Sequence, residues 1–298
     1  MDADWDDLRI FLAVARAESL SGAGSALKLD PATVGRRISR LEEALGAKLF
    51  ARSPQGYALT DAGSRLLPHA TRAEQAFAGA AEEMGSDAGQ LTGQLRVGAP
   101  DGCANYLLPQ VCAAICDENP GLELQIVALP RVFNLSKREA DMAIAVSPPQ
   151  TGRLSVQKIT DYHLHLAAHR DYLARTPPIT AQADLKGHRM VGYIPDMIFD
   201  KELDYLSEIG VTAVPLASNS VPVQLNWLRA GAGVGIVHDF ALPFAPELEK
   251  ILPEKISLTR AFYLIRHADD RRLDRLNRFA AVLAQGIRAE VARLEALT

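Results

Sequence analysis

Arginines able to hold nucleic-acid phosphates are concentrated in one short stretch of the chain. The segment from Ser19 to Gly63 reads SLSGAGSALKLDPATVGRRISRLEEALGAKLFARSPQGYALTDAG, and its Arg36, Arg37 and Arg40 fall within two helical turns. A guanidinium can grip a phosphate, or the O6 and N7 atoms of guanine, through two parallel hydrogen bonds. The residue types and their spacing therefore point to contact with DNA.

Local charge supports this interpretation although the whole chain is acidic. The net charge is −4 over 298 residues, but Lys28 to Arg65 holds seven basic residues against four acidic ones. Such asymmetry is expected when a single module meets phosphates.

Helical periodicity places these arginines on the third of three N-terminal helices. The first helix carries Leu8, Phe11, Leu12 and Ala15, with Trp5 covering one end, and the second runs to about Lys28. Asp30 can cap a third helix whose first position is Pro31, since proline has no amide hydrogen to lose there. Its buried stripe is predicted to be Val34, Ile38, Leu41 and Leu45, which turns the arginines toward other faces. Residues 48–60 then predict a hairpin.

An alternative is that the three arginines form an ordinary solvated helix face. In that case they would pair with Glu42 and Glu43, as charged helix faces commonly do. The tight turn, the cap and the basic hairpin together favour DNA binding, which requires guanidiniums that protrude without such partners.

Residues 8–63 resemble the winged helix-turn-helix of the LysR-type transcriptional regulators, above all in LEEALGAKLFARSPQGYALTDAG. The resemblance implies an α/β protein with three parts: a winged helix-turn-helix, a long linker helix, and a two-lobed α/β effector domain of periplasmic-binding-protein type. It also implies double-stranded DNA, a small-molecule effector and a second copy of the chain as partners. The DNA contacts that it implies are Pro31, Ala32, Thr33, Gly35, Arg36, Arg37 and Arg40 in the recognition helix and Arg52 in the wing.

This chain departs from the family pattern at three positions at or near the start of the recognition helix. The family usually has Ser at position 30, often Gln at 31, and Ser at 35, where this chain has Asp30, Pro31 and Gly35. Asp30 keeps the capping role, but its charge repels phosphate, and Gly35 offers no side chain to a base.

The predicted DNA-binding domain, which we call the reading head, spans residues 1–60. A long helix should follow it. From Asp61 the apolar positions keep a spacing of three and four over about six turns, and Pro68 lies early enough to kink the helix. The stripe consists of Ala62, Leu66, Ala70, Ala73, Phe77, Ala80 and Met84. One alternative is that this helix packs on its own domain. A narrow apolar stripe favours instead its pairing with the same helix of a second subunit, in a dimer or tetramer. The linker and hinge are predicted at 61–89.

Residues 90–298 alternate strands with helices, which favours parallel sheets and the two lobes of an effector domain. Lobe 1 is predicted at about 90–160 plus 268–298 and lobe 2 at about 161–267. Ligands bind at the carboxyl ends of such strands, so the candidate effector residues are Asp101, Gly102, Cys103, Arg131, Ser147, Tyr193, Asp196, Ser218, Asn219, Ser220 and His238. The start of a helix at 218–221, with hydroxyls and unpaired amides, suits a carboxylate, and Arg131 supplies a counter-charge.

Other chemistry is weakly supported. Cys103, Cys112 and Cys116 are interpreted as small buried thiols on one helix, and His163, His165 and His169 lack a companion ligand for a metal. The glycine run 231–235 follows a helix and precedes a strand, the reverse of a dinucleotide loop. We therefore expect no enzyme activity, cofactor or metal.

The acidic N-terminus and the lack of a long apolar run predict a cytoplasmic chain without a membrane partner. Two other hypotheses stay open: a small-molecule binding protein or enzyme with a vestigial N-terminal module, and a DNA-bending protein, which would leave two-thirds of the chain without a role.

Overall fold

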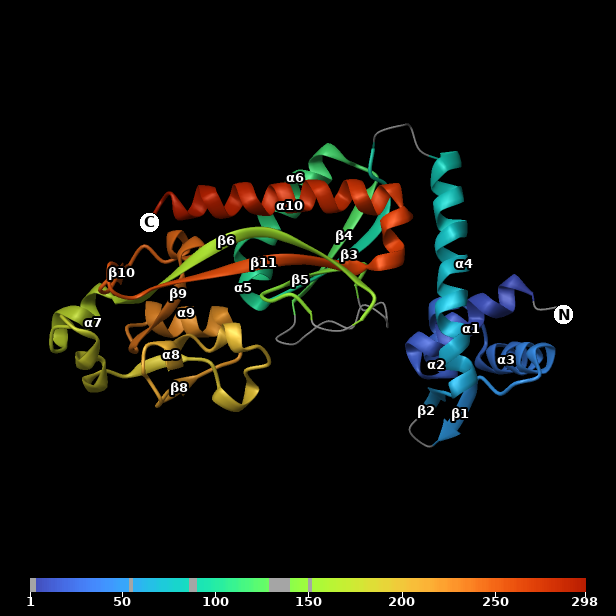
Figure 1. The fold of residues 1–298 in the computed structure, drawn as a ribbon, viewed down its shortest axis with the longest axis horizontal. Helices are drawn as coiled ribbons and strands as arrows, with labels where there is room; N and C mark the ends of the chain where they lie inside the picture. The colour runs from blue at the N-terminus through green and yellow to red at the C-terminus, as the bar shows by residue number, and fades with distance from the viewer. Residues whose placement is uncertain (1–3, 54–55, 86–89, 129–139, 150–151) are drawn as a thin grey trace. The chain divides into compact units, whose positions relative to one another are not determined.

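The computed structural model describes residues 4–53, 56–85, 90–128, 140–149 and 152–298. Internal contacts divide the chain into two units, Met1–Ala88 and Gly89–Thr298. Figure 1 shows a small helical unit and a larger α/β unit.

Three short helices, a two-stranded ribbon and one long helix make up the N-terminal unit. Their bounds are α1 Trp5–Ala17, α2 Leu20–Leu27, α3 Pro31–Leu45, β1 Phe50–Ser53, β2 Gly56–Leu59 and α4 Asp61–Gly85. The strands pair antiparallel, with Phe50 opposite Leu59 and Ser53 opposite Gly56. The predicted helices and the hairpin are confirmed.

A tight turn sets the angle between α2 and α3. Lys28 adopts left-handed backbone angles (φ 56°), and the amide of Leu29 donates to the carbonyl of Gly24 at 2.9 Å. A Cβ atom on Gly24 would lie 2.6 Å from the carbonyl oxygen of Leu29, so this close approach requires glycine.

The core of this unit is formed by α1, α2, α3 and the ribbon. Phe11 is fully buried and packs against Phe50 with ring centroids 5.3 Å apart. Val34, Ile38 and Leu41 are buried as predicted, whereas Leu45 is half-buried at the end of α3. This packing fixes which side of α3 faces outward.

Helix α4 uses its first turns on its own unit. Ala62, Leu66 and Ala70 pack against the N-terminal core, and the helix continues through Pro68. Phe77 is 67% exposed, and its ring meets that of Trp5 with centroids 6.1 Å apart. The first half of the predicted apolar stripe therefore packs on its own unit, whereas Phe77 further along is exposed. The side chains of Ala80 and Met84 lie outside the described part.

One curled sheet runs through the C-terminal unit. The strand order is β4-β3-β5-β11-β6-β9-β7-β8, and β10 pairs with β6. The bounds are β3 Gly93–Ala99, β4 Leu122–Ala128, β5 Met142–Ala145, β6 Leu154–His169, β7 Met190–Gly192, β8 Leu216–Ala217, β9 Val234–His238, β10 Leu248–Lys250 and β11 Ser257–His267. Strands β3–β5 are parallel, as are β7–β9, and we call these two ends the first and second lobes.

Two long antiparallel strands join the lobes. Strand β6 spans 16 residues and pairs with β11 over most of that length, from Ser257 opposite His165 to His267 opposite Leu154. Strand β6 thus contributes to both lobes, and β11 is an element that the sequence did not reveal.

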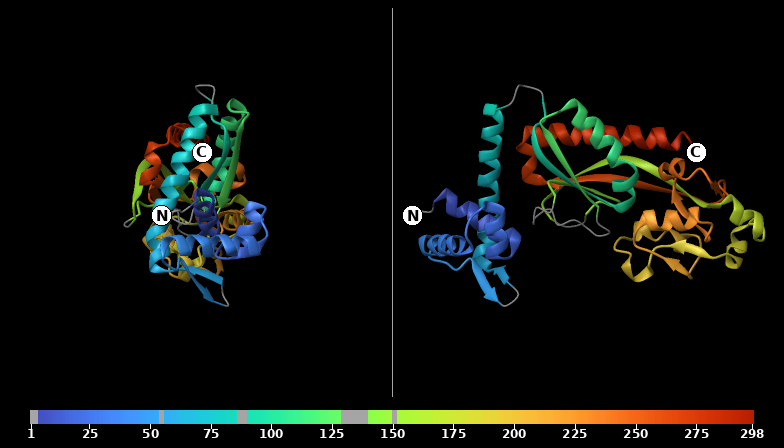
Figure 2. Two further views of the ribbon diagram at one scale, coloured as in Figure 1. Left: turned by 90° about the vertical axis from the view of Figure 1, so that its right-hand side faces the viewer. Right: turned by 180° about the vertical axis from the view of Figure 1, so that it is seen from behind.

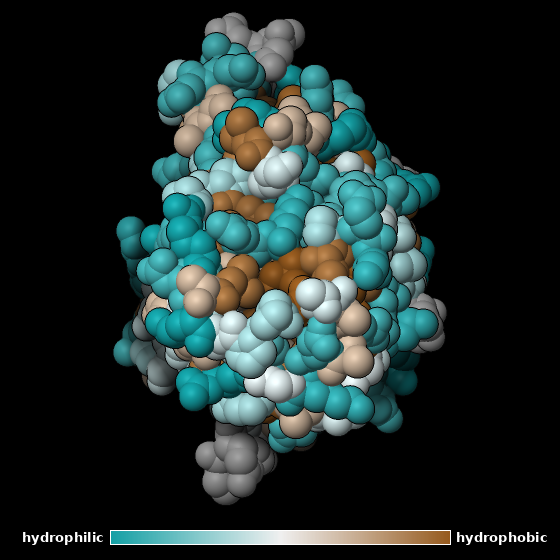
Figure 3. Space-filling model, turned by 90° about the vertical axis from the view of Figure 1, so that its left-hand side faces the viewer, coloured by the Kyte–Doolittle hydropathy of each residue, from teal (hydrophilic) through white to brown (hydrophobic). Residues whose placement is uncertain are grey.

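Helices cover the sheet on both lobes. In the first lobe these are α5 Asp101–Tyr106, α6 Leu108–Glu118 and the 22-residue α10 Asp274–Glu295, which lies along β6 and beside α6 (Figures 1 and 2). The second lobe carries α7 Arg170–Arg175, α8 Tyr205–Glu208 and α9 Val221–Arg229. Figure 3 shows one face of the molecule as largely hydrophilic, with apolar side chains gathered in a band across its middle.

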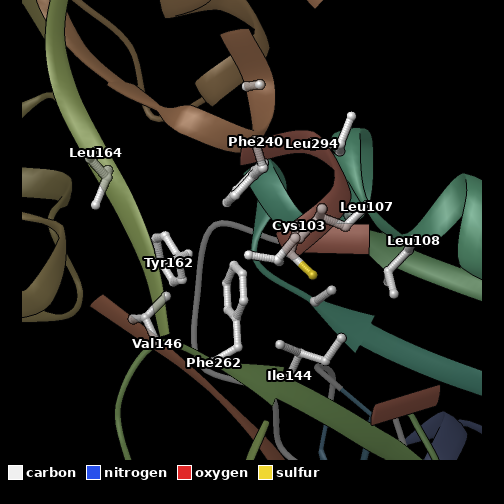
Figure 4. Close-up of a cluster of buried hydrophobic side chains, with 14 of the residues drawn as sticks. Cys103, Leu107, Leu108, Ile144, Val146, Tyr162, Leu164, Phe240, Phe262 and Leu294 are labelled. Carbon is white, nitrogen blue, oxygen red and sulfur yellow. The ribbon is translucent and has the colours of Figure 1, made fainter. Parts of the chain in front are cut away.

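Aromatic rings fill the region where the lobes meet. Tyr162 of β6 stacks on Phe262 of β11 with centroids 4.2 Å apart, and Phe240 meets Tyr162 edge-on at 5.6 Å. Figure 4 shows these rings beside Cys103 of α5. The junction is thus close-packed and apolar, and it positions the strand ends around it.

Candidate functional site

The start of α3 is exposed and well capped. The Asp30 carboxylate accepts a hydrogen bond from the amide of Ala32 at 2.8 Å, and Pro31 occupies the first helical turn. Pro31 and Ala32 are exposed, and Thr33 and Gly35 are half-buried. Because Ala32 and Gly35 are small and Asp30 is a short cap, the backbone of this turn can approach the surface of a binding partner closely.

Arg36 protrudes from this turn. Its guanidinium donates to the hydroxyl of Thr33 at 3.2 Å, and no carboxylate of the described residues lies within ion-pair distance of it. Arg36 is therefore a cation of α3 whose charge is available to a partner.

Arg37 and Arg40 are held differently from the prediction that all three guanidiniums protrude unpaired. Arg40 forms a two-pronged pair with the buried carboxylate of Asp7, at 2.5 and 2.6 Å. Arg37 lies 3.3 Å from Asp6 and 3.5 Å from Asp7. The prediction fails for these two because α1 packs across α3 and brings its acidic first turn to them.

The glutamates of α3 are not the partners of the arginines. Burial alone would raise the pKa of Glu42, but hydrogen bonds from Lys48 and from the amides of Leu49 and Phe50 lower it overall. Lys48 Nζ lies 2.6 Å from this carboxylate. Glu42 therefore fastens the ribbon to α3, and pairing between Glu42 and the arginines is excluded.

The ribbon is tied to the end of α1. The amide of Tyr57 donates to the carbonyl of Glu18 at 2.8 Å. Gly56 has a φ of 131°, and a Cβ atom at this position would lie 2.5 Å from the same carbonyl oxygen, which is too close. Arg52 lies on β1, opposite Tyr57. The exposed start of α3 and the ribbon with Arg52 belong to one unit whose core fixes their separation.

The predicted carboxylate cradle at the start of α9 is already occupied. The Asp101 carboxylate accepts a hydrogen bond from the amide of Val221 at 2.8 Å, and the Ser218 hydroxyl accepts one from the amide of Ser220 at 3.1 Å. The prediction of unpaired amides is wrong because α5 of the first lobe reaches the start of α9 in the second. Asp101 thus links the lobes.

Three predicted effector residues are part of the core. Gly102, Cys103 and His238 are buried, and a Cβ atom on Gly102 would lie 3.5 Å from the imidazole of His238. Burial lowers the pKa of His238 to about 4. These three residues are therefore enclosed by their neighbours in the structure, and His238 is uncharged at neutral pH.

The other predicted residues are dispersed around the junction. Ser147 donates to Asp200, which forms a second link between lobes. Tyr193 packs edge-on against Tyr205 at 5.9 Å, and burial raises its pKa well above 10. Asp196 is exposed and Asn219 half-buried, while Arg131 lies outside the described residues.

The histidines and cysteines have separate surroundings. His163 contacts Glu295, His165 contacts Asp239, and His169 caps α7. Across the described ranges, no group of three metal-ligating side chains comes together. Cys103 lies in α5, apart from Cys112 and Cys116 in α6, so the three thiols are not on one helix; burial raises the pKa of Cys112 to about 11.

A pocket that the sequence did not reveal lies wholly within the second lobe. It measures about 240 Å³ and is lined by residues between Val191 and Ile236, including Tyr193, Leu206 and Gln224. Its lining comes from β7, β9, α8, α9 and the loops between them, so no local motif marks it. Only Tyr193 among the predicted effector residues belongs to it.

Within the part of the chain that the structure describes, no helix has both the length and the apolar character needed to cross a membrane.

Comparison with known proteins gives a consistent result over almost the whole chain. Residues 5–64 match the family described as bacterial regulatory helix-turn-helix protein, lysR family, and residues 88–288 match the LysR substrate binding domain. A probable hydrogen peroxide-inducible genes activator of Mycobacterium avium is 32% identical over 255 residues, covering 79% of this chain and 78% of the relative. The regulator PtxR of Pseudomonas aeruginosa is 27% identical, covering 78% and 76%.

Solved full-length regulators have the same fold. A full-length OxyR variant of Pseudomonas aeruginosa matches with a TM-score of 0.71 at 20% identity, covering 96% of this chain and 98% of that one. LysG of Corynebacterium glutamicum with bound effector Arg matches with a TM-score of 0.64 at 17% identity, covering 97% and 98%. The chain belongs to the LysR family of DNA-binding transcriptional regulators, with a helix-turn-helix reading head followed by the family's substrate-binding domain.

Proposed function

We propose that this regulator reads DNA through the exposed start of α3 and through the ribbon. Arg36 carries the proposal, because it is an exposed guanidinium of α3 whose hydrogen bond goes to a hydroxyl and not to a carboxylate. Pro31, Ala32, Thr33 and Gly35 would let the helix approach the major groove, and Arg52 would lie along the backbone beside it. Arg37 would contribute after exchange of its exposed partner Asp6 for a phosphate, and Arg40, which is 55% exposed, would contribute while it keeps its pair with Asp7.

The test is DNA binding by Arg36→Ala against fragments from the gene's own chromosomal neighbourhood. Each lost phosphate contact lowers the slope of log affinity against log salt by about 1. The matched control is Arg293→Ala, which removes an exposed arginine of α10 that pairs with Glu290. Equal affinity and equal salt slope for Arg36→Ala and the unmodified protein would contradict the assignment.

We also infer that the protein works as a homo-oligomer formed through α4. Phe77 supports this inference, because a 67% exposed phenyl ring in the middle of a long helix is a large apolar surface left open by its own unit. A paired reading head would bind two half-sites.

We propose that a small molecule bound near the lobe junction modulates DNA binding. Asp101–Val221 and Ser147–Asp200 both cross between lobes, so a ligand that alters either contact would alter the angle between them. A carboxylate effector is less favoured than the sequence indicated, since the chain's own Asp101 caps α9. Cys103 and Cys112 are poor candidates for redox sensing, because burial raises the pKa of each and so favours the thiol over the more reactive thiolate.

A further inference from the structure

The pocket inside the second lobe has a built apolar interior and a polar mouth. Val191, Leu203, Leu206 and Ile236 line it and are buried. Ser207 and Thr212 line it and are exposed, so they mark the side that opens to solvent. At about 240 Å³ it is smaller than the roughly 300–1,000 Å³ of drug-sized sites, which suits a molecule of one ring.

The charge of the lining excludes an anion. Among the described residues that line the pocket there is no lysine, arginine or histidine, and the charged one is Asp204. An anion buried here would lose hydration without a counter-charge and would face a carboxylate. The pocket therefore differs from the site for a carboxylate that the start of α9 suggested.

The mouth offers hydrogen-bond acceptors. The Ser207 hydroxyl donates to the carbonyl of Asp204 at 3.1 Å, which leaves its oxygen lone pairs for a ligand. The Asp204 carboxylate receives no hydrogen bond from any residue in the described ranges. A ligand group that donates, such as a hydroxyl, fits this edge.

Tyr205 connects the pocket to the lobe junction. Its ring lines the pocket, while its hydroxyl lies 3.4 Å from Nε2 of the buried His238. Behind it lies a void of about 10 Å³, also lined by His238 and Val221, and about the smallest space that holds one water. Tyr205 and Val221, whose amide Asp101 caps, line this void together, so a ligand that moves Tyr205 would act on a neighbour of that contact.

We propose that this pocket binds a single-ring molecule without negative charge, its ring among the aliphatic side chains and a hydrogen-bond-donating group, such as a hydroxyl, at the mouth. The role of this molecule as effector rests on the proposed function, whereas its binding does not.

The experiment uses full-length protein and three single-ring probes of similar size and different charge: benzyl alcohol, benzoate and benzylamine. A ligand that binds only the folded state raises the melting temperature in step with its concentration. Benzyl alcohol should give a saturable rise and benzoate none. Benzylamine, whose ammonium group also donates hydrogen bonds, should give a rise as well. Binding of benzoate as strong as that of benzyl alcohol would overturn the proposal.

Two substitutions locate the site. Val214→Phe fills the pocket and should weaken benzyl alcohol binding at least about tenfold, while Val223→Phe, the same change at an exposed position of α9, should leave it unchanged. Should Val214→Phe fail to fold, Val214→Ala enlarges the pocket and should favour 4-methylbenzyl alcohol over benzyl alcohol. Equal binding by Val214→Phe and Val223→Phe would place the ligand elsewhere.

The outcome is separable from that of the DNA-binding test. If the protein retards DNA but ignores benzyl alcohol, the pocket proposal fails and the proposed function stands. If it binds benzyl alcohol but no DNA, the proposed function fails and the pocket proposal stands.

Discussion

At the scale of single residues, we propose that the acidic first turn of α1 competes with DNA phosphates for the arginines of α3. Asp6 and Asp7 hold Arg37 and Arg40 as phosphates would hold them. The buried Asp7 is also structural, since removing its partner would leave an uncompensated charge. Asp6 is half-exposed, and so its replacement tests competition without breaking the core.

We therefore predict that Asp6→Asn strengthens DNA binding. It removes the negative charge 3.3 Å from Arg37 and leaves Asp7, at 3.5 Å, as the carboxylate beside that guanidinium, so the arginine is more available to a phosphate. Affinity should rise about two- to fivefold near 0.1 M salt, with a salt slope steeper by up to about 1. Gel-shift titrations at several salt concentrations measure both. Asp117→Asn, at an exposed position of α6, is the control, and weaker binding by Asp6→Asn would refute the competition.

His238 should make stability depend on pH. Its pKa is lowered by burial to about 4 in the folded protein, from 6.5 in the unfolded chain. Between these values the unfolded state binds the extra proton, so stability is complete above about pH 7.5 and falls as the pH drops toward 4. The loss at pH 4 is about 3 kcal/mol. Denaturant unfolding of the unmodified protein and His238→Gln across pH 4–8 should show this difference, and parallel curves would contradict it.

Residue types in the reading head could be predicted from sequence, but their partners could not. Asp30, Pro31 and the buried face of α3 follow from local rules of capping and periodicity. The pair between Arg40 and Asp7 spans 33 positions and depends on how α1 crosses α3, which no local spacing encodes. The same holds for Asp101, whose partner lies 120 positions away.

At the scale of elements, local periodicity revealed the helices better than the strands. The 16 residues of β6 pass through both lobes, and their burial alternates irregularly because the neighbours change along the strand. Burial alternates with a period of two only over residues 162–166, so most of this strand carries no clear sequence signal. The crossing pair of β6 and β11 joins residues about 100 positions apart, which is a property of the folded sheet.

Asp101 should stabilise the C-terminal unit through α9. Its carboxylate caps the helix in place of a local N-cap side chain, since Ser220 makes no such bond. Asp101→Ala should lower the free energy of unfolding by about 1–2 kcal/mol, the usual cost of losing a cap. Chemical denaturation measures this change, with Asp117→Ala as the exposed control. Equal stability of the two variants would mean that the lobes do not depend on this contact.

At the scale of the whole molecule, two paired reading heads impose a geometric demand on DNA. If α4 pairs with the α4 helix of a second subunit, both reading heads must bind the same side of the duplex. Half-sites one helical turn apart lie on the same side. Inserting 5 base pairs between half-sites turns one of them by about half a turn, whereas inserting 10 restores the phase.

We predict that the 5-base-pair insertion weakens binding more than the 10-base-pair insertion. Phe77→Glu should remove this distinction, because a charge in the apolar contact separates the subunits and leaves each head to bind alone. Gel-shift titration on the three spacings, with sedimentation of Phe77→Glu, provides the measurement. Identical affinity for all three spacings by the unmodified protein would mean that its reading heads are not coupled, since rigid pairing and indifference to phase are incompatible.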